Sequence, residues 1–264
     1  MRLCSGLLLV QSSVVFASLL HKAIVLPTLN DIDKVGVQNI AMIDKTRLDP
    51  FTNQTRYREL MVSLFYPTHG PRSQLLVDQQ TRYHSGNPLT PYMPPATAAF
   101  YGDFLAKDGV AKGTIERIFT RCQDSAPTPK DPSVHPLIIF SPGGGGSRFL
   151  YTTIAQEIAR KGYIVASLDH PFDALVVEFP DGRMIRGVDI DSPYLVELMV
   201  EVRAQDVSFV IDELGSTSLS YPFSVNVNNT VVVGHSPGGA TSAEVALNDT
   251  RVRGGVNFDG RLFG

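Results

Sequence analysis

The segment Val231–Ala240 constrains the fold of this chain more than any other. It reads Val-Val-Val-Gly-His-Ser-Pro-Gly-Gly-Ala, so an apolar β-branched run meets Gly234-x-Ser236-x-Gly238 and a plausible helix follows. A strand, a sharp turn and a helix in this order expose a serine hydroxyl at the end of a central sheet. The two glycines let the backbones of strand and helix approach closely. The segment therefore predicts a nucleophile elbow within an α/β fold, with Ser236 as the nucleophile.

Strands and helices alternate from residue 136 onward. Residues 136–140 and 163–168 are apolar runs typical of buried strands, and the glycine-rich loop 141–146 follows the first. The residues Leu150, Ile154 and Ile158 lie at helical spacing between the two runs. This pattern predicts parallel strands joined by a helix. A mostly parallel sheet flanked by helices, as in α/β-hydrolases, is therefore the expected fold class.

A long helix is expected after a hairpin turn at residues 178–183. Ser192 is its expected cap and Pro193 its first residue. Asp206 falls on the apolar stripe of this helix, and we expect it to pair with Arg203 at the edge of the stripe. The stripe consists of Leu195, Met199, Val202 and Phe209.

The first half of the chain has a different character. Residues 35–66 read as antiparallel strands, with Pro67 ending the clearest of them. Residues 68–132 are rich in proline, glycine, glutamine and threonine, and two short helices are expected near 96–106 and 112–121. Long loop-rich insertions often serve as lids. We therefore expect a cap over the site within one hydrolase domain, residues 18–264.

The N-terminal residues 1–17 resemble a secretory signal peptide, because Arg2 precedes an apolar stretch that ends in small residues. Three glycosylation sequons, at Asn53, Asn228 and Asn248, agree with a secreted, extracellular glycoprotein. The net charge is −3, and no basic patch points to nucleic acid. No metal-binding motif is apparent, and we expect no cofactor.

An activated serine needs a base, an acid that orients the base, and an oxyanion hole. Asp259, 23 residues after Ser236 at the end of the last apolar run, is the expected acid. Gly144, with Gly145 next in line, is the expected oxyanion donor. The second donor should be the backbone N–H of the residue after Ser236. That residue is Pro237, and proline has no N–H. All six histidines precede Ser236, so none follows the acid in the order Ser, Asp, His.

Five stretches together resemble the plasma-type platelet-activating-factor acetylhydrolase family, especially its fungal secreted members. They are residues 58–67, 140–144, 169–174, 234–239 and 254–260. The resemblance implies a calcium-independent esterase that cleaves short or oxidised sn-2 acyl chains from phospholipids through an acyl-enzyme. It assigns Ser236, Asp259 and Gly144 the roles given above, and implies transient contact with a lipid surface. In members of this family a bulky apolar residue usually follows the nucleophilic serine, where this sequence has Pro237. Their chains also continue past the acid to a histidine. We therefore expect an incomplete sheet at the C-terminus and impaired activity.

Three other functions fit parts of the sequence. A catalytically impaired hydrolase that binds lipids or esters fits Pro237 and the missing base. A generic secreted carboxylesterase or lipase fits the same elbow. A dinucleotide-binding unit fits the strand, glycines 143–146, helix and Asp169, but its third glycine would be Arg148 and it leaves the elbow unexplained.

Overall fold

The computed structural model describes residues 23–29, 34–53, 55–68, 89–129, 131, 135–189, 193–216 and 225–262. The signal peptide expected at 1–17 and the cap residue Ser192 lie outside these residues. The chain divides into two compact units. One comprises Met1–Pro27 and Pro71–Arg121, and the other comprises Thr28–Gly70 and Cys122–Gly264.

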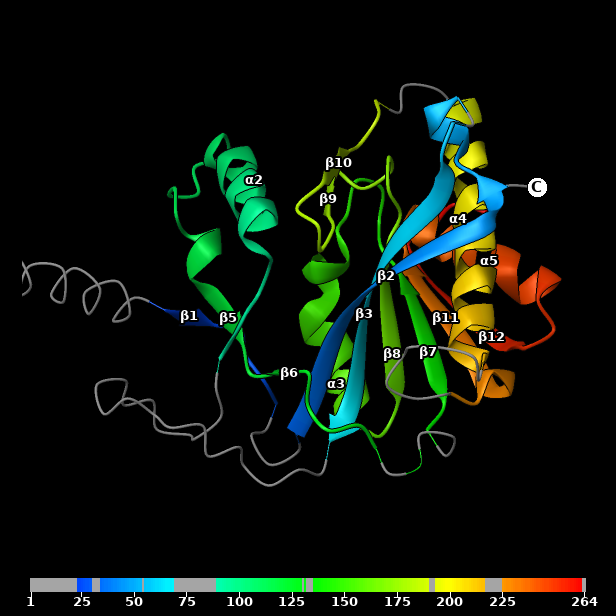
Figure 1. Ribbon diagram of the computed structural model, residues 1–264, viewed down its shortest axis with the longest axis horizontal. Coiled ribbons are helices and arrows are strands. Elements are labelled where there is room, and N and C mark those ends of the chain that lie inside the picture. The colour runs from blue at the N-terminus through cyan, green and yellow to red at the C-terminus, as the bar shows by residue number, and fades with distance from the viewer. Residues whose placement is uncertain are drawn as a thin grey trace, which may run out of the picture. The chain divides into compact units, whose positions relative to one another are not determined.

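The larger unit is built on a seven-stranded sheet with the strand order β12-β11-β7-β8-β3-β2-β6 (Figure 1). The four strands β12, β11, β7 and β8 run parallel, whereas β3 pairs antiparallel with both β8 and β2. The strands are β2 (Lys34–Leu48), β3 (Tyr57–Thr68), β6 (Gln123–Asp124), β7 (Leu137–Ser141), β8 (Ile164–Asp169), β11 (Thr230–His235) and β12 (Val252–Phe258). The predicted α/β class is confirmed, with a mostly parallel sheet.

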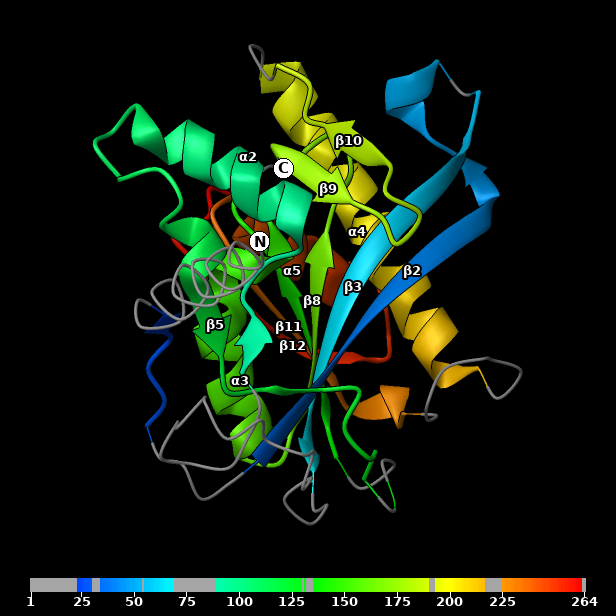
Figure 2. The same cartoon turned by 60° about the vertical axis from the view of Figure 1, so that its left-hand side comes forward.

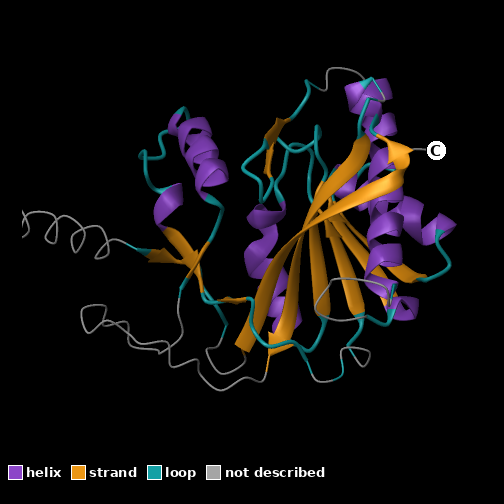
Figure 3. Ribbon diagram, viewed as in Figure 1, coloured by secondary structure: helices purple, strands orange, loops and turns teal. Residues whose placement is uncertain are grey.

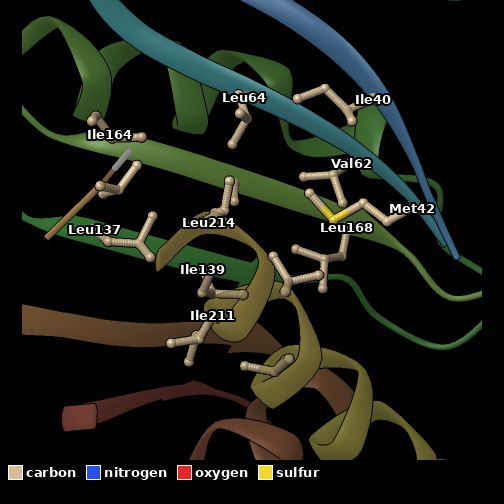
Figure 4. Packing of buried hydrophobic residues seen from close by; sticks show 14 of the residues in the cluster. Ile40, Met42, Val62, Leu64, Leu137, Ile139, Ile164, Leu168, Ile211 and Leu214 are labelled. Atoms are coloured by element: carbon tan, nitrogen blue, oxygen red, sulfur yellow. The ribbon is translucent and has the colours of Figure 1, made fainter. Parts of the chain in front are cut away.

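Helices cover both faces of this sheet (Figures 2 and 3). The helices α4 (Pro193–Gly215) and α5 (Pro237–Asn248) pack on one face, and α3 (Thr152–Arg160) packs on the other. In the larger core, Ile211 and Leu214 of α4 lie against Ile139 and other strand residues (Figure 4). No helix in the described ranges is long and apolar enough to span a bilayer.

Two local expectations for this unit need correction. The strand β3 continues through Pro67 to Thr68, because Pro67 still pairs with Val35 near the strand's end. The helix α3 forms, but Leu150 and Ile154 are each 46% exposed, and the helix buries its small residues Ala155 and Ala159 instead. Close approach to the sheet favours small side chains, so the apolar spacing identified the helix but not its buried face.

Other expectations for this unit are confirmed. The helix α4 begins at Pro193 as predicted. The hairpin turn is also present, between β9 (Val176–Glu178) and β10 (Met184–Arg186), which pair antiparallel. Residues 231–235 and 254–258 lie in adjacent parallel strands, β11 and β12.

Within its described residues, the smaller unit contains a three-stranded sheet and the helix α2. Its strands are β1 (Ile24–Val25), β4 (Thr90–Pro91) and β5 (Ile118–Thr120), in the order β1-β5-β4, and its helix is α2 (Pro95–Ala106). The helix expected near 112–121 is absent. A short 3-10 turn at Ile115–Arg117 leads into β5 instead, because Ile118 and Phe119 pair with β1. Whether this unit covers the site stays a prediction.

Candidate active site

Ser236 lies between β11 and α5 in a strained backbone conformation, with φ 54° and ψ −125°. A non-glycine residue at positive φ is uncommon and marks a constrained position. A Cβ atom added to Gly234 would overlap the carbonyl oxygen of Gly238, and one added to Gly238 would overlap that of Ser141. The turn can therefore close only because both positions are glycine. Ser236 thus occupies the elbow that the sequence predicted.

Asp259 lies beside this elbow, directly after β12. His235 and Phe258 are partners in the parallel ladder, and the Ser236 N–H donates to the Phe258 carbonyl at 2.8 Å. Asp259 is exposed and has a positive φ of 58°. The register of two neighbouring strands therefore brings the predicted acid next to the predicted nucleophile, at the carboxyl edge of the sheet.

The glycine loop after β7 contains one N–H that has no acceptor among the described residues. The Gly143 N–H donates to Tyr151 Oη at 3.0 Å, and the Gly145 N–H points at Asp173 Oδ1 at 3.4 Å. Gly144 is exposed, and its N–H meets no acceptor in the part of the chain that the structure describes. A Cβ atom on Gly144 would lie 3.5 Å from the Pro237 ring. Gly144 therefore stands beside the residue that follows the nucleophile, where an oxyanion donor belongs.

The three histidines in the described ranges all bond to groups other than Asp259. His135 Nδ1 lies 2.7 Å from the Gly162 carbonyl oxygen. His235 Nδ1 lies 2.9 Å from Tyr151 Oη, which agrees with a structural role. His170 is buried, and its ring nitrogens contact Ser141 Oγ and Asp206 Oδ2. None of the three is placed as the base that Asp259 would orient.

Asp206 is fully buried, and its partner differs from the expected one. It accepts hydrogen bonds from Arg58 at 2.7 and 3.1 Å and from Arg47 at 2.9 Å, not from Arg203. Arg203 instead pairs with Asp173. Burial alone would raise the pKa of Asp206, but the Arg58 charge and a hydrogen bond from His170 outweigh it and hold this pKa well below its usual range.

His170 completes a buried serine–histidine–aspartate chain that the sequence did not reveal. Its Nδ1 lies 2.9 Å from Asp206 Oδ2, and its Nε2 lies 3.0 Å from Ser141 Oγ. The carboxylate can only accept, so we assign the ring proton to Nδ1 and a donated hydroxyl proton to Nε2. Burial lowers the pKa of His170, although the hydrogen bond to Asp206 opposes this. Ser141 is fully buried, so no substrate carbonyl reaches it.

Comparison with known proteins shows that the chain is similar to esterases. Residues 47–176 match the family model described as platelet-activating factor acetylhydrolase, isoform II. The chain is 30% identical to a probable 1-alkyl-2-acetylglycerophosphocholine esterase of Arthroderma benhamiae, over 94% of this chain and 62% of the relative. It is 26% identical to a platelet-activating factor acetylhydrolase of Gallus gallus, over 64% of this chain and 50% of the relative. The chain thus spans only part of the length of these relatives.

One solved structure gives a useful structural match. The ferulic acid esterase from Streptomyces cinnamoneus superimposes with a TM-score of 0.66 and 29% sequence identity, over 86% of this chain and 58% of that chain. The predicted α/β-hydrolase fold is confirmed by this match and by the elbow geometry.

Proposed function

We propose that the chain is a serine esterase of phospholipids. The match of residues 47–176 to the family model described as platelet-activating factor acetylhydrolase, isoform II, supports this proposal. Its proposed substrates are phospholipids with short or oxidised sn-2 acyl chains, of the 1-alkyl-2-acetylglycerophosphocholine type named for the fungal relative. The observation that carries the proposal is the strained Ser236 elbow, with Asp259 and the open Gly144 N–H beside it.

In the proposed reaction, Ser236 Oγ attacks the ester carbonyl carbon, and the carbonyl electrons move onto oxygen. The Gly144 N–H donates to this oxyanion. The intermediate collapses to an acyl-enzyme as the lysophospholipid alcohol leaves with the serine proton, and water then hydrolyses the acyl-enzyme. Asp259 would orient the base that carries this proton and stabilise its charge. His135, His170 and His235 are engaged elsewhere, so we assign the base to none of them.

A second candidate function is an impaired hydrolase that binds lipids or esters. Pro237 favours it, because the first residue of α5 offers no N–H to the oxyanion. One missing donor costs on the order of 100- to 1,000-fold in rate.

A fluorophosphonate probe separates the two candidates, because it phosphonylates only an activated serine. For an esterase, we expect saturable labelling of the wild type and none of the Ser236→Ala variant. Turnover of an sn-2 acetyl phospholipid should also exceed that of its palmitoyl analogue. Equal labelling of both proteins would refute the assignment of Ser236. An unlabelled wild type that still binds phospholipid would support the second candidate.

We also propose that the protein is secreted and glycosylated. Asn53, Asn228 and Asn248 are all exposed, as glycan attachment requires. The expected result is a mass decrease of the natural protein on enzymatic deglycosylation, and an unchanged mass would contradict the proposal.

Transient contact with a lipid surface is proposed as well, with the exposed Leu150 and Ile154 as support. Co-sedimentation with phosphatidylcholine vesicles tests it, and a protein that stays in the supernatant would contradict it.

A further inference from the structure

Arg203 of α4 forms a buried ion pair underneath the glycine loop. Its Nε lies 2.5 Å from Asp173 Oδ2 and its Nη2 lies 2.6 Å from Asp173 Oδ1. The two side chains are 1% and 2% exposed. Two parallel hydrogen bonds of this kind fix the plane of the guanidinium group. Neither residue belongs to the elbow or to the acid, so the proposed reaction leaves the pair unexplained.

The same guanidinium group also binds the backbone of the loop. Its Nη1 donates to the Pro142 carbonyl oxygen at 2.5 Å, and its Nη2 donates to the Gly143 carbonyl oxygen at 3.3 Å. On the other side of Gly144, Asp173 Oδ1 lies 3.4 Å from the Gly145 N–H. The ion pair therefore holds the loop on both sides of Gly144, which is exposed and whose N–H has no acceptor among the described residues.

The position of this one N–H matters more here than in a site with two backbone donors. Pro237 supplies none, and within the glycine loop Gly144 is the residue whose N–H has no acceptor among the described residues. A displacement of about 1 Å in a catalytic group costs on the order of 100-fold in rate. A loop of consecutive glycines has little stiffness of its own, and something must hold it.

We propose that Arg203, held by Asp173, is a positioning residue that sets the oxyanion donor Gly144 N–H. Arg203 acts through the carbonyl groups of Pro142 and Gly143 and does not touch the substrate. The inference rests on the proposed esterase function. The planar guanidinium group of Arg203 binds a carboxylate and two carbonyl groups at once, which the single ammonium group of lysine cannot do.

The test compares Arg203→Met and Arg203→Lys with the wild type in two measurements. The first is the rate of fluorophosphonate labelling of Ser236. We expect a fall on the order of 100-fold in Arg203→Met, with partial recovery in Arg203→Lys. The second is hydrogen exchange of the bonded amides of Gly143, Gly145 and Gly146, measured by mass spectrometry. We expect this exchange to be at least about tenfold faster in Arg203→Met, because the loop loses its anchor.

Arg58→Lys is the matched control. Arg58 is as buried as Arg203 and binds two carboxylates, Asp49 and Asp206, but it does not contact residues 142–145. At equal free energy of unfolding, reached by adjusting the urea concentration, we expect its loop exchange and labelling rate to match the wild type. If Arg203→Met does not fold, Arg203→Lys and Asp173→Asn replace it in the same comparison.

Two outcomes would overturn the proposal. The first is loop exchange in the Arg203 variants equal to that of the wild type. The second is an equal loss of labelling in Arg58→Lys, which would indicate general destabilisation. Failure of the proposed function looks different, because the wild type itself would then not label. The exchange measurement would still decide whether Arg203 positions the loop.

Discussion

The β3 and β8 side of the sheet is fixed by buried charges, whereas the β11 and β12 side is fixed by glycines. On the first side, the guanidinium groups of Arg58, Arg148 and Arg203 are each about 1% exposed and each is paired with buried carboxylates. On the second side, added Cβ atoms at Gly234, Gly238, Gly239, Gly255 and Gly260 would all collide with neighbouring atoms.

The two mechanisms fail in opposite ways. A charge network fails when a partner is removed, because the remaining ion is left buried and unpaired. A glycine contact fails when atoms are added, because two backbones are then forced apart. The site draws on both, since Ser236 belongs to the glycine-held side and Gly144 to the charge-held side. Either side can therefore be perturbed while the other serves as the reference.

The largest effect is expected for Asp206→Ala, on the charge-held side. The variant removes one of the two buried carboxylates that pair with Arg58 and leaves His170 Nδ1 without its acceptor. Breaking a buried pair in this way costs about 3–5 kcal/mol of unfolding free energy. Urea denaturation followed by circular dichroism measures it. The control is Asp181→Ala, because Asp181 pairs with Arg183 on the surface, and no measurable change is expected there. Comparable losses in the two variants would show that Asp206 contributes no more than a surface pair.

The next largest effect is a gain in activity, which we expect for Pro237→Ala. Alanine restores an N–H after the nucleophile, and one oxyanion donor is worth on the order of 100- to 1,000-fold in rate. The fluorophosphonate labelling rate of Ser236 measures the gain. Pro193→Ala removes a proline from the start of α4 and adds no donor at the site, so it serves as the control. No gain in Pro237→Ala would mean that the Gly144 N–H is the only backbone donor the oxyanion uses.

A smaller effect is expected within one strand, at two adjacent glycines of β12. A Cβ atom at Gly255 would lie 2.6 Å from the Ser242 carbonyl oxygen, whereas one at Gly254 would have open space. Gly255→Ala should therefore cost about 1–3 kcal/mol, because α5 and β12 must separate. Gly254→Ala should stay within about 0.5 kcal/mol of the wild type. Thermal or urea denaturation compares the pair directly, and equal stabilities would argue against glycine-limited packing on this side.

The glycine-held side was readable from the sequence because its signals are local. The elbow needs Gly234, Ser236 and Gly238 within five residues, and the apolar runs around it predicted β11, α5 and β12. Asp259 followed from its place at the end of the last run, and Gly144 from its place after β7. The exposure of Ile154 could not be predicted, because apolar spacing does not show which face of α3 packs on the sheet.

The charge-held side was not readable in this way. Asp206 and Arg58 are 148 residues apart, so nothing local favours this pair over Asp206 and Arg203. One signal could have helped. Two charges at positions i and i+3 on a buried helix face each need a partner, and Asp173 is a carboxylate close in sequence to a predicted strand end. The choice between partners still depends on the tertiary structure.

The smallest effect concerns pH and should again distinguish the two sides. The pKa of His170 in the folded state lies below 6.5, so below pH 6.5 the unfolded chain binds a proton that the folded chain does not. The free energy of unfolding should therefore fall as the pH drops below 6.5, by up to about 1.4 kcal/mol per pH unit, and this group contributes no slope above it. The lowered pKa of Asp206 acts only below its ordinary value of 3.8. Urea denaturation at pH 7.5, 6.5 and 5.5 measures the slope, and His170→Gln should reduce it. At pH 5.5 the protection of backbone amides, measured relative to their intrinsic exchange rate at that pH, should fall in β8 and α4 before β11 and β12, because acid removes charge complementarity and adds no atoms at the glycine contacts. An unchanged slope in His170→Gln would assign the pH dependence to other groups.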